Sequence, residues 1–237
     1  LTIAPKSASE GKKLTIAPKS ASEGKKLTIA PPASKKLTIK PKKEEHISSK
    51  HDKNSKDYKI YFSIDIGARN FNICVMKRYI DIKRKPPVIL KWLKFSMFEG
   101  QKKIRVTQNA LRLLTAELDA LDEYIKQSSI VLVEKQPGGK SNVMMRIEQH
   151  TLTYFDLRYP NIKCECIPSK WKFIHLGAPE GMTPYRRKRW SIMKCKEFLI
   201  ERERWGELAF LEDQQKLDDF AETYTQIEGY IKKKKLK

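Results

Sequence analysis

The sequence predicts an α/β domain in which a mixed, five-stranded sheet is flanked by helices. Two observations lead to this prediction. Three strand-like segments follow one another closely between residues 58 and 98, and short links join consecutive strands in antiparallel order. Beyond residue 98, helix-like and strand-like segments alternate, and a helical connection places successive strands in parallel. The domain is therefore expected to span residues 58–237, after a tail of different composition.

The tail, residues 1–57, consists largely of a degenerate repeat. The unit LTIAPKSASEGKK occupies residues 1–13 and 14–26, and shortened copies follow at 27–36 and 37–46. Each unit contains too few apolar residues to form a core, so the tail is predicted to be a disordered, basic linker. Its role as a DNA-tethering arm or as an inert spacer stays open.

The first three strands are indicated by their side-chain pattern. Ile60, Phe62 and Ile64 alternate with more polar residues, a period of two that is typical of a strand. Two further strands follow, FNICVMKR at 71–78 and VILKWLKFSMF at 88–98. Since only short links separate these segments, they predict an antiparallel meander.

Helical and strand patterns then alternate to the end of the chain. Apolar residues at near-helical spacing between 103 and 126 predict one long amphipathic helix. The run SSIVLVE at 128–134 is typical of a central, buried strand. The remaining elements are expected in this order: a helix at 141–158, a strand at 162–167, and terminal helices at about 186–204 and 210–231. This order of elements is that of an RNase H-like fold.

The chain is strongly basic, with 49 Lys and Arg against 28 Asp and Glu and a formal net charge of +21. Residues 1–57 contain 14 basic and 6 acidic residues, so the remaining 35 and 22 leave the predicted domain with +13 of its own. Because a basic surface that neutralises phosphates releases their counterions, this excess favours a polyanionic partner such as DNA.

Membrane and redox signals favour an intracellular, reducing compartment. No apolar run approaches the ~18 residues that a membrane span needs, and the Lys-rich N-terminal region lacks the apolar segment of a signal peptide. No membrane partner is therefore expected. The cysteines show no CxxC pair and no histidine at ligand spacing, so we expect reduced thiols rather than a zinc site. They are Cys74, Cys164, Cys166 and Cys195.

Acidic residues stand at three places where the local pattern does not require them. Asp65 ends an apolar strand, where a turn-forming role is the alternative. Glu134 closes a buried strand, where a carboxylate needs a partner or a metal unless the strand end is exposed. In KLDDFAET, Asp218, Asp219 and Glu222 lie opposite the apolar stripe of the last helix, a face that is often only solvated. Both Asp218 with Glu222 and Asp219 with Glu222 have helical spacing, so the register stays open.

Carboxylates from separate elements are what a magnesium nuclease site requires. Mg²⁺ prefers hard oxygen ligands, and two such ions roughly 3.5–4 Å apart can activate a water and stabilise the leaving oxygen of a phosphodiester. A strand-end Asp, a strand-end Glu and a helical acidic pair supply the three or four carboxylates needed. The acidic residues therefore predict a metal-dependent nuclease.

Four segments resemble the motifs of the poxvirus-type Holliday junction resolvases, relatives of the bacterial RuvC-type and fungal mitochondrial resolvases. The resemblance covers roughly residues 58–231. EKQP and KLDD are its most specific matches, while residues 78–127 match only in pattern. The four segments are FSIDIGARNFNICV, LVEKQPGGKSNV, PYRRKRWSIMKCKEFL and QKLDDFAETY.

This resemblance implies an RNase H-like endonuclease that works as a homodimer on branched double-stranded DNA. It implies the resolution of four-way junctions by paired, symmetric nicks during DNA recombination or replication. It also implies dependence on Mg²⁺, with Mn²⁺ as a substitute. If the chain is a viral protein, as the poxvirus resolvases are, the expected location is the viral replication site in the host cytoplasm or nucleus.

The resemblance also implies site residues. The metal ligands of the family fall on Asp65, Glu134, Asp219 and Glu222. Glu222 is a departure, because the family usually has Asp there and Glu is one methylene longer. The catalytic lysine of the family falls on Lys188 in PYRRKRW, although the register also allows Arg187 or Arg189. A basic helix start that only contacts phosphate is the alternative for this segment.

Two other interpretations stay open at this point. One is an RNase H-like nuclease that acts on flaps or other branched DNA. The other is a non-catalytic DNA-binding protein on the same fold. The intact Asp65, Glu134 and Asp219 argue against the second, because a site that has lost its activity usually loses a carboxylate.

Overall fold

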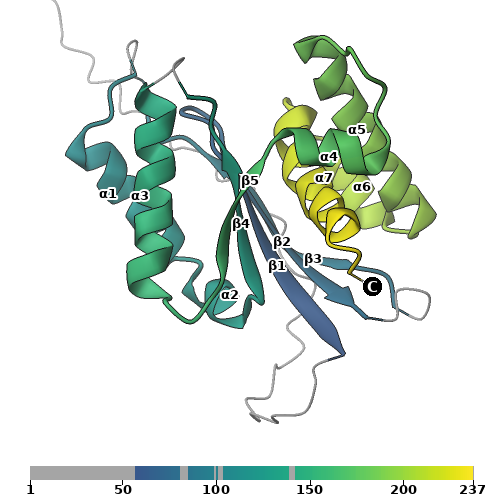
Figure 1. Cartoon of the computed structure of the whole chain (residues 1–237), viewed down its shortest axis with the longest axis horizontal. Helices are drawn as coiled ribbons and strands as arrows, with labels where there is room; N and C mark the ends of the chain where they lie inside the picture. Colours follow the sequence, from purple (N-terminus) through teal and green to yellow (C-terminus); the bar gives the residue numbers. More distant parts are fainter. Residues whose placement is uncertain (1–56, 81–84, 99, 101–103, 139–141, 237) are drawn as a thin grey trace, which may run out of the picture. The chain divides into compact units, whose positions relative to one another are not determined.

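The computed structural model describes residues 57–80, 85–98, 100, 104–138 and 142–236. The predicted tail lies outside the described residues, except for Asp57. The described chain forms an α/β fold with a mixed, five-stranded sheet flanked by helices (Figure 1). The predicted fold class is thereby confirmed.

The sheet has the strand order β3-β2-β1-β4-β5. As predicted, the first three strands form an antiparallel meander, and the two later strands join parallel to β1. The carboxyl ends of β1 and β4 therefore lie at the same edge of the sheet. The strands are β1 (Tyr58–Asp65), β2 (Phe71–Tyr79), β3 (Val88–Phe95), β4 (Ile130–Lys135) and β5 (Cys164–Pro168).

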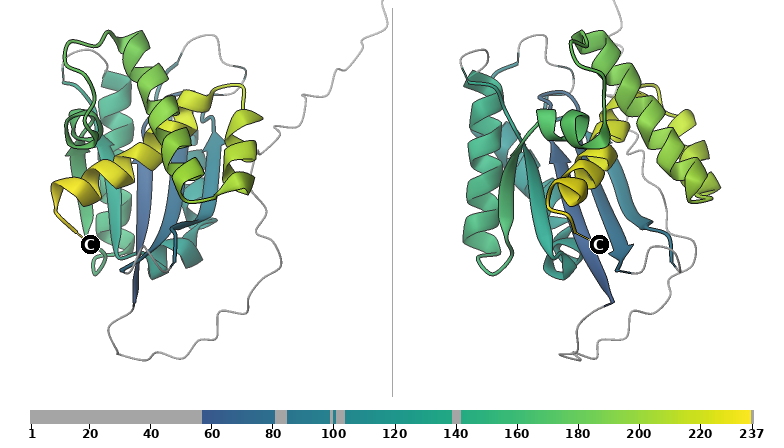
Figure 2. Two further views of the ribbon diagram at one scale, coloured as in Figure 1. Left: turned by 90° about the vertical axis from the view of Figure 1, so that its right-hand side faces the viewer. Right: turned by 45° about the vertical axis from the view of Figure 1, so that its right-hand side comes forward.

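Helices cover both faces of the sheet (Figures 1 and 2). One face carries α1 (Gln108–Asp119), α2 (Asp122–Gln127) and α3 (Asn142–Arg158). The other carries α4 (Lys170–Leu176), α5 (Pro184–Glu201), α6 (Trp205–Glu212) and α7 (Leu217–Lys233). Figure 2 shows that α7 crosses the strands, so this helix lies between the sheet and α4 and α5.

Successive side chains of β1 pack into two separate cores. Ile60, Phe62 and Ile64 are buried beneath α1 to α3, whereas Tyr61 is buried with the residues of α5 to α7. A strand that is covered on both faces is apolar at almost every position. Polar residues in β1 are therefore exceptional, and Asp65 at its end is one of them.

The predicted single helix at 103–126 is wrong, because the structure has two helices there. Thr107 accepts a hydrogen bond from the backbone N–H of Ala110 at 3.2 Å, so it caps α1 and sets its first residue at 108. The helix stops at Ala120, and α2 begins only after Leu121. Leu121 itself is buried in the core, so the apolar spacing continues through the break.

The predicted terminal helices at 186–204 and 210–231 are three helices, and the short α4 was not predicted. Thr183 accepts a hydrogen bond from the N–H of Arg186 and Pro184 fits the first turn, so α5 begins before residue 186. Just beyond α5, Glu203 has a left-handed φ of 54°. This reversal separates α5 from α6.

The structure also bears on redox and membrane expectations. All four cysteines are free thiols. Among the described residues, none of the helices combines the length and the apolar character needed to cross a membrane.

Gly229 lies where α7 comes closest to α4. A Cβ atom on Gly229 would lie 2.7 Å from the Cα of Lys172 and 3.1 Å from its backbone nitrogen. Backbone atoms cannot swing away as side chains do, so only glycine allows this approach. The position of α4 on α7 therefore depends on a residue without a side chain.

We expect Gly229→Ala to lower the free energy of unfolding by about 1–3 kcal/mol, the usual cost of overpacking. Alanine is normally more stabilising than glycine inside a helix. A loss of stability in Gly229→Ala would therefore indicate the close approach of Lys172. Gly206→Ala in α6 is the matched control, because a Cβ there meets nothing within 4 Å. The control should change stability by less than about 1 kcal/mol. Urea denaturation measures both variants, and equal stabilities would contradict the close approach.

Candidate metal centre

Three acidic side chains from three elements meet at the edge where β1 and β4 end. Asp65 is the last residue of β1, Glu134 precedes the last residue of β4, and Glu222 lies in the second turn of α7. One carboxylate oxygen of each lies within 4.8 Å of the others, and all three residues are partly buried. We call these residues the carboxylate cluster.

A tight turn fixes the position of Asp65. Asp65 faces Asn72 across the β1–β2 hairpin. In the intervening turn, a Cβ on Gly67 would lie 2.3 Å from the carbonyl oxygen of Asn70, so a glycine is required for this close approach. The side-chain amide of Asn72 donates to the same carbonyl at 2.7 Å. The turn directly after Asp65 thus packs around the carbonyl of Asn70.

Hydrogen bonds hold the first half of α7 against the sheet. The indole N–H of Trp92, on β3, donates to Oγ1 of Thr223 at 3.1 Å. The side-chain amide of Gln226 donates to the backbone carbonyls of Ile64 at 3.2 Å and Leu132 at 3.4 Å. Those carbonyls belong to β1 and β4, close to their acidic ends. Gln226 therefore ties α7 to the two strands that contribute the other carboxylates.

The end of β4 is held from the opposite face of the sheet by Glu148 of α3. This buried carboxylate accepts the backbone N–H of Gln136 at 2.9 Å and the thiol of Cys166 at 3.2 Å. Gln136 lies two residues after Glu134, so the contact fixes the chain just beyond the cluster. This role of Glu148 is not evident from the sequence, because an acid in mid-helix is ordinarily exposed.

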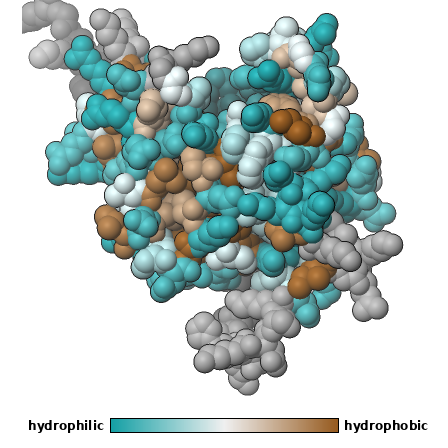
Figure 3. Space-filling view, in the orientation of Figure 1, coloured by the Kyte–Doolittle hydropathy of each residue, from teal (hydrophilic) through white to brown (hydrophobic). Residues whose placement is uncertain are grey.

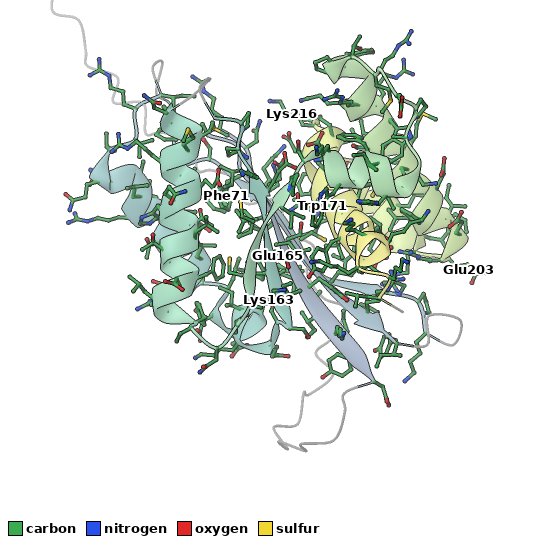
Figure 4. The ribbon with its side chains drawn as sticks, in the orientation of Figure 1. Phe71, Lys163, Glu165, Trp171, Glu203 and Lys216 are labelled. Atoms are coloured by element: carbon green, nitrogen blue, oxygen red, sulfur yellow. The ribbon has the colours of Figure 1, made fainter. Side chains whose placement is uncertain are left out.

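A buried lysine from α4 completes the site. The ammonium group of Lys172 lies 2.8 Å from Oε2 of Glu134 and 3.0 Å from Oε2 of Glu222, and the side chain is only 2% exposed. Figure 4 labels Trp171, its neighbour on α4, and Lys216, the residue before α7. Lys172 was not predicted as a site residue because the pattern of α4 is too short to indicate a helix. The available signal was the helical spacing of Lys172 and Leu176, both of which face inward.

The two acids in the first turn of α7 face different cations. Asp218 accepts a hydrogen bond from the ammonium group of Lys188 at 2.6 Å. Asp219 lies 3.5 Å from Nζ of Lys94 on β3. The structure therefore brings Glu222 into the carboxylate cluster and leaves Asp219 beside it. The predicted roles of Asp219 and Glu222 as metal ligands stay predictions.

Of the three basic residues considered for the catalytic lysine, Lys188 faces the acids of α7. Its side chain is 57% exposed at the start of α5. The Arg187 guanidinium instead lies over the ring of Phe173, and that of Arg189 over the ring of Tyr185, each at 5.9 Å. Lys188 is thus an exposed cation at the rim of the site, in contrast to the buried Lys172.

Burial and mutual repulsion dominate the electrostatics of the cluster. Burial raises the pKa of Asp65 well above its ordinary value, and the neighbouring Glu134 and Glu222 raise it further, while Lys172 opposes them. Burial alone would lower the pKa of Lys172, but the carboxylates of Glu134, Glu222 and Asp65 outweigh it and raise that pKa. Lys172 is therefore held as a charged ammonium.

The donor set fits a hard divalent cation. Asp65, Glu134 and Glu222 offer carboxylate oxygens from three separate elements, and Mg²⁺ and Mn²⁺ prefer such oxygen ligands. The ammonium of Lys172, bound by two of these carboxylates, already stands in for a cation at this place. Three carboxylates against one ammonium leave the cluster with a net negative charge that a divalent ion would neutralise.

No protein-family model matches the chain, and no curated protein matches it. Solved structures of Holliday junction resolvases do resemble it. The fowlpox virus resolvase, solved with Holliday junction DNA, has a TM-score of 0.50 and 21% identity, covering 75% of this chain and 99% of that chain. The yeast mitochondrial resolvase Ydc2 has a TM-score of 0.53 and 15% identity, covering 73% and 78%. The chain therefore has the RNase H-like fold of the resolvases.

We expect Asp65→Asn to stabilise the metal-free protein at neutral pH. Because the pKa of Asp65 is raised in the folded state, the wild type loses stability as pH rises from the ordinary Asp pKa of about 4 towards the raised value. Asn carries no charge and avoids this loss. The advantage of the variant should be largest near pH ~8 and should shrink towards pH ~4.

Thermal unfolding in the presence of EDTA measures this difference across the pH range. Asp156→Asn on α3 is the matched control, because Asp156 is exposed and lies outside the cluster. A stability difference between Asp65→Asn and wild type that does not change with pH would show that the pKa of Asp65 is not raised in the folded protein.

Proposed function

We propose that this chain is a divalent-metal-dependent endonuclease that resolves four-way DNA junctions. The observation that supports the proposal most directly is the convergence of Asp65, Glu134 and Glu222 at one edge of a resolvase-type sheet. The substrate class is inferred from the fold, which resembles that of a resolvase solved with Holliday junction DNA. A purely DNA-binding protein has no use for three partly buried carboxylates that repel one another and the phosphates of DNA.

In this proposal each element of the site has a separate task. Asp65, Glu134 and Glu222 would hold the metal, which supplies Lewis-acid activation of a water and of the scissile phosphate. Gln226 and Glu148 keep the strand ends and α7 in register. Asp219 and Lys94 extend the site towards β3, where Asp219 could complete the ligand set that the family resemblance implies.

The DNA would approach along the exposed, basic start of α5. Arg186, Arg187, Lys188 and Arg189 are all exposed there, and Lys188 reaches the acids of α7. Hydrophilic residues also cover most of the face shown in Figure 3. Cations at this rim would bind phosphates and bring the backbone to the carboxylate cluster. Paired, symmetric nicks need two such sites, so we propose that the active form is a homodimer.

Binding to a four-way junction should depend steeply on salt. With a net charge of +13 for residues 58–237, phosphate contacts are expected to dominate. The affinity of the Asp65→Asn variant, measured by gel shift in EDTA, should then fall by about 10³-fold or more between roughly 50 and 200 mM salt. Affinity that is independent of salt would contradict the proposal that this chain binds nucleic acid.

Substitution of a cluster carboxylate should abolish cleavage but preserve binding. Asp65→Asn, Glu134→Gln and Glu222→Gln keep size and shape while removing a ligand charge. Each should reduce junction cleavage in Mg²⁺ by about 10³-fold or more, since metal-assisted activation contributes several kcal/mol. Asp219→Asn should behave alike if Asp219 is a ligand, whereas Asp218→Asn should be milder. Double substitutions should be strongly non-additive, because they disable one site.

The assay compares a synthetic four-way junction with duplex, flap and RNA–DNA hybrid substrates. Glu165→Gln on β5 is the matched control, because its ion pairs with Lys163 and Lys234 lie outside the cluster, and it should leave cleavage unchanged. Flap cleavage in preference to junction cleavage would favour the alternative of a nuclease for other branched DNA. Substantial junction nicking by Asp65→Asn would overturn the metal-site assignment.

A further inference from the structure

Lys172 is delivered into the carboxylate cluster from a fixed point on the backbone. The close approach of α4 to α7 at Gly229 sets the position of its Cα atom. Gly229 lies seven residues, or two helical turns, beyond Glu222, so both are on the same face of α7. Gly229 positions the backbone of Lys172, and Glu222 binds its ammonium group. Both therefore act from one face of α7.

The ammonium of Lys172 also occupies a position where a metal ion would compete with it. Its contacts at 2.8 and 3.0 Å are with Glu134 and Glu222, and both belong to the cluster whose oxygens lie within 4.8 Å of one another. Nearby cations are paired elsewhere, Lys188 with Asp218 and Lys94 with Asp219. Among the residues that the structure describes, Lys172 is thus the cation in contact with the cluster itself.

A charge count shows how many divalent ions the cluster accommodates. With all three carboxylates ionised, as they are when they bind a divalent ion, the cluster and the ammonium of Lys172 sum to a charge of −2, which one such ion neutralises. A second divalent ion would create an excess of positive charge in a partly buried site, and such unpaired charge is strongly unfavourable. Without Lys172 the same carboxylates would carry −3, and a second ion would then be attracted.

We propose that Lys172 fills the position of a second cation, so that the site without DNA binds one divalent ion per chain. The inference rests on the metal site of the proposed function. A second ion is then accommodated only together with the negative charge of a DNA phosphate. The lysine thereby couples full metal loading to the presence of substrate.

The test counts bound metal in the absence of DNA. Mn²⁺ is titrated into the full-length protein, and loss of the electron paramagnetic resonance signal of free Mn²⁺ gives the number of bound ions. We expect one ion per chain for the wild type and two for Lys172→Gln, whose amide still donates a hydrogen bond but carries no charge. Lys196→Met removes a lysine that pairs with Glu212 on the outer helices, and this control should bind one ion.

The outcomes separate this inference from the proposed function. Two ions in the wild type, or one ion in both wild type and Lys172→Gln, would overturn the role of Lys172 and leave the nuclease proposal intact. No bound Mn²⁺ in the wild type would overturn the metal site itself. Circular dichroism checks folding. If Lys172→Gln does not fold, the double variant Lys172→Gln, Glu222→Gln restores the net charge of −2 and should bind one ion. The number of ions bound by the wild type then tests the role of Lys172 by itself.

Discussion

The site depends on one electrostatic constraint: three carboxylates that lie within 4.8 Å of one another cannot all be ionised without a cation beside them. In the described structure Lys172 supplies that charge from a buried position. Breaking a buried ion pair by removing one partner typically costs about 3–5 kcal/mol, so the loss of Lys172 should be strongly destabilising. The backbone of Lys172 is positioned where the short helix α4 packs on α7 at Gly229, which has no side chain.

The topology of the sheet explains why the carboxylates meet at all. β1 and β4 are parallel neighbours at the centre of the sheet, so their last residues lie at one edge. The third carboxylate comes from α7, which crosses the strands and is buried along most of its length. Gln226 links α7 to β1 and β4 through their backbone carbonyls. The geometry of the cluster thus rests on the parallel pairing of β1 with β4 and on the Gln226 side chain that bonds to the backbones of both strands.

Sequence patterns were sufficient for the strands and for the acids at their ends, because strand periodicity and a charge in an apolar run are both local signals. The acidic residues of α7 were harder to assign to the site, because helical spacing allowed more than one pair of them. Only the packing of α7 shows that Glu222 joins Asp65 and Glu134. Lys172 was missed for a different reason. Its helix has only seven residues, and a lysine is expected to be exposed unless a tertiary contact pays for its burial. The break between α1 and α2 was likewise hidden, since Leu121 keeps the apolar spacing.

The cations around the site differ in exposure, and this difference suits different tasks. Lys172 is 2% exposed and already bound to two carboxylates, so it cannot reach a phosphate without leaving them. Lys188 is 57% exposed and bound to a single carboxylate of α7, and a screened surface pair of this kind is worth little and exchanges partners readily. In the proposed function, a DNA phosphate would therefore compete with Asp218 for Lys188 at small cost. The fold thus separates a buried cation, which sets the charge of the carboxylate cluster, from an exposed one at the rim, where the DNA backbone would arrive in the proposed function.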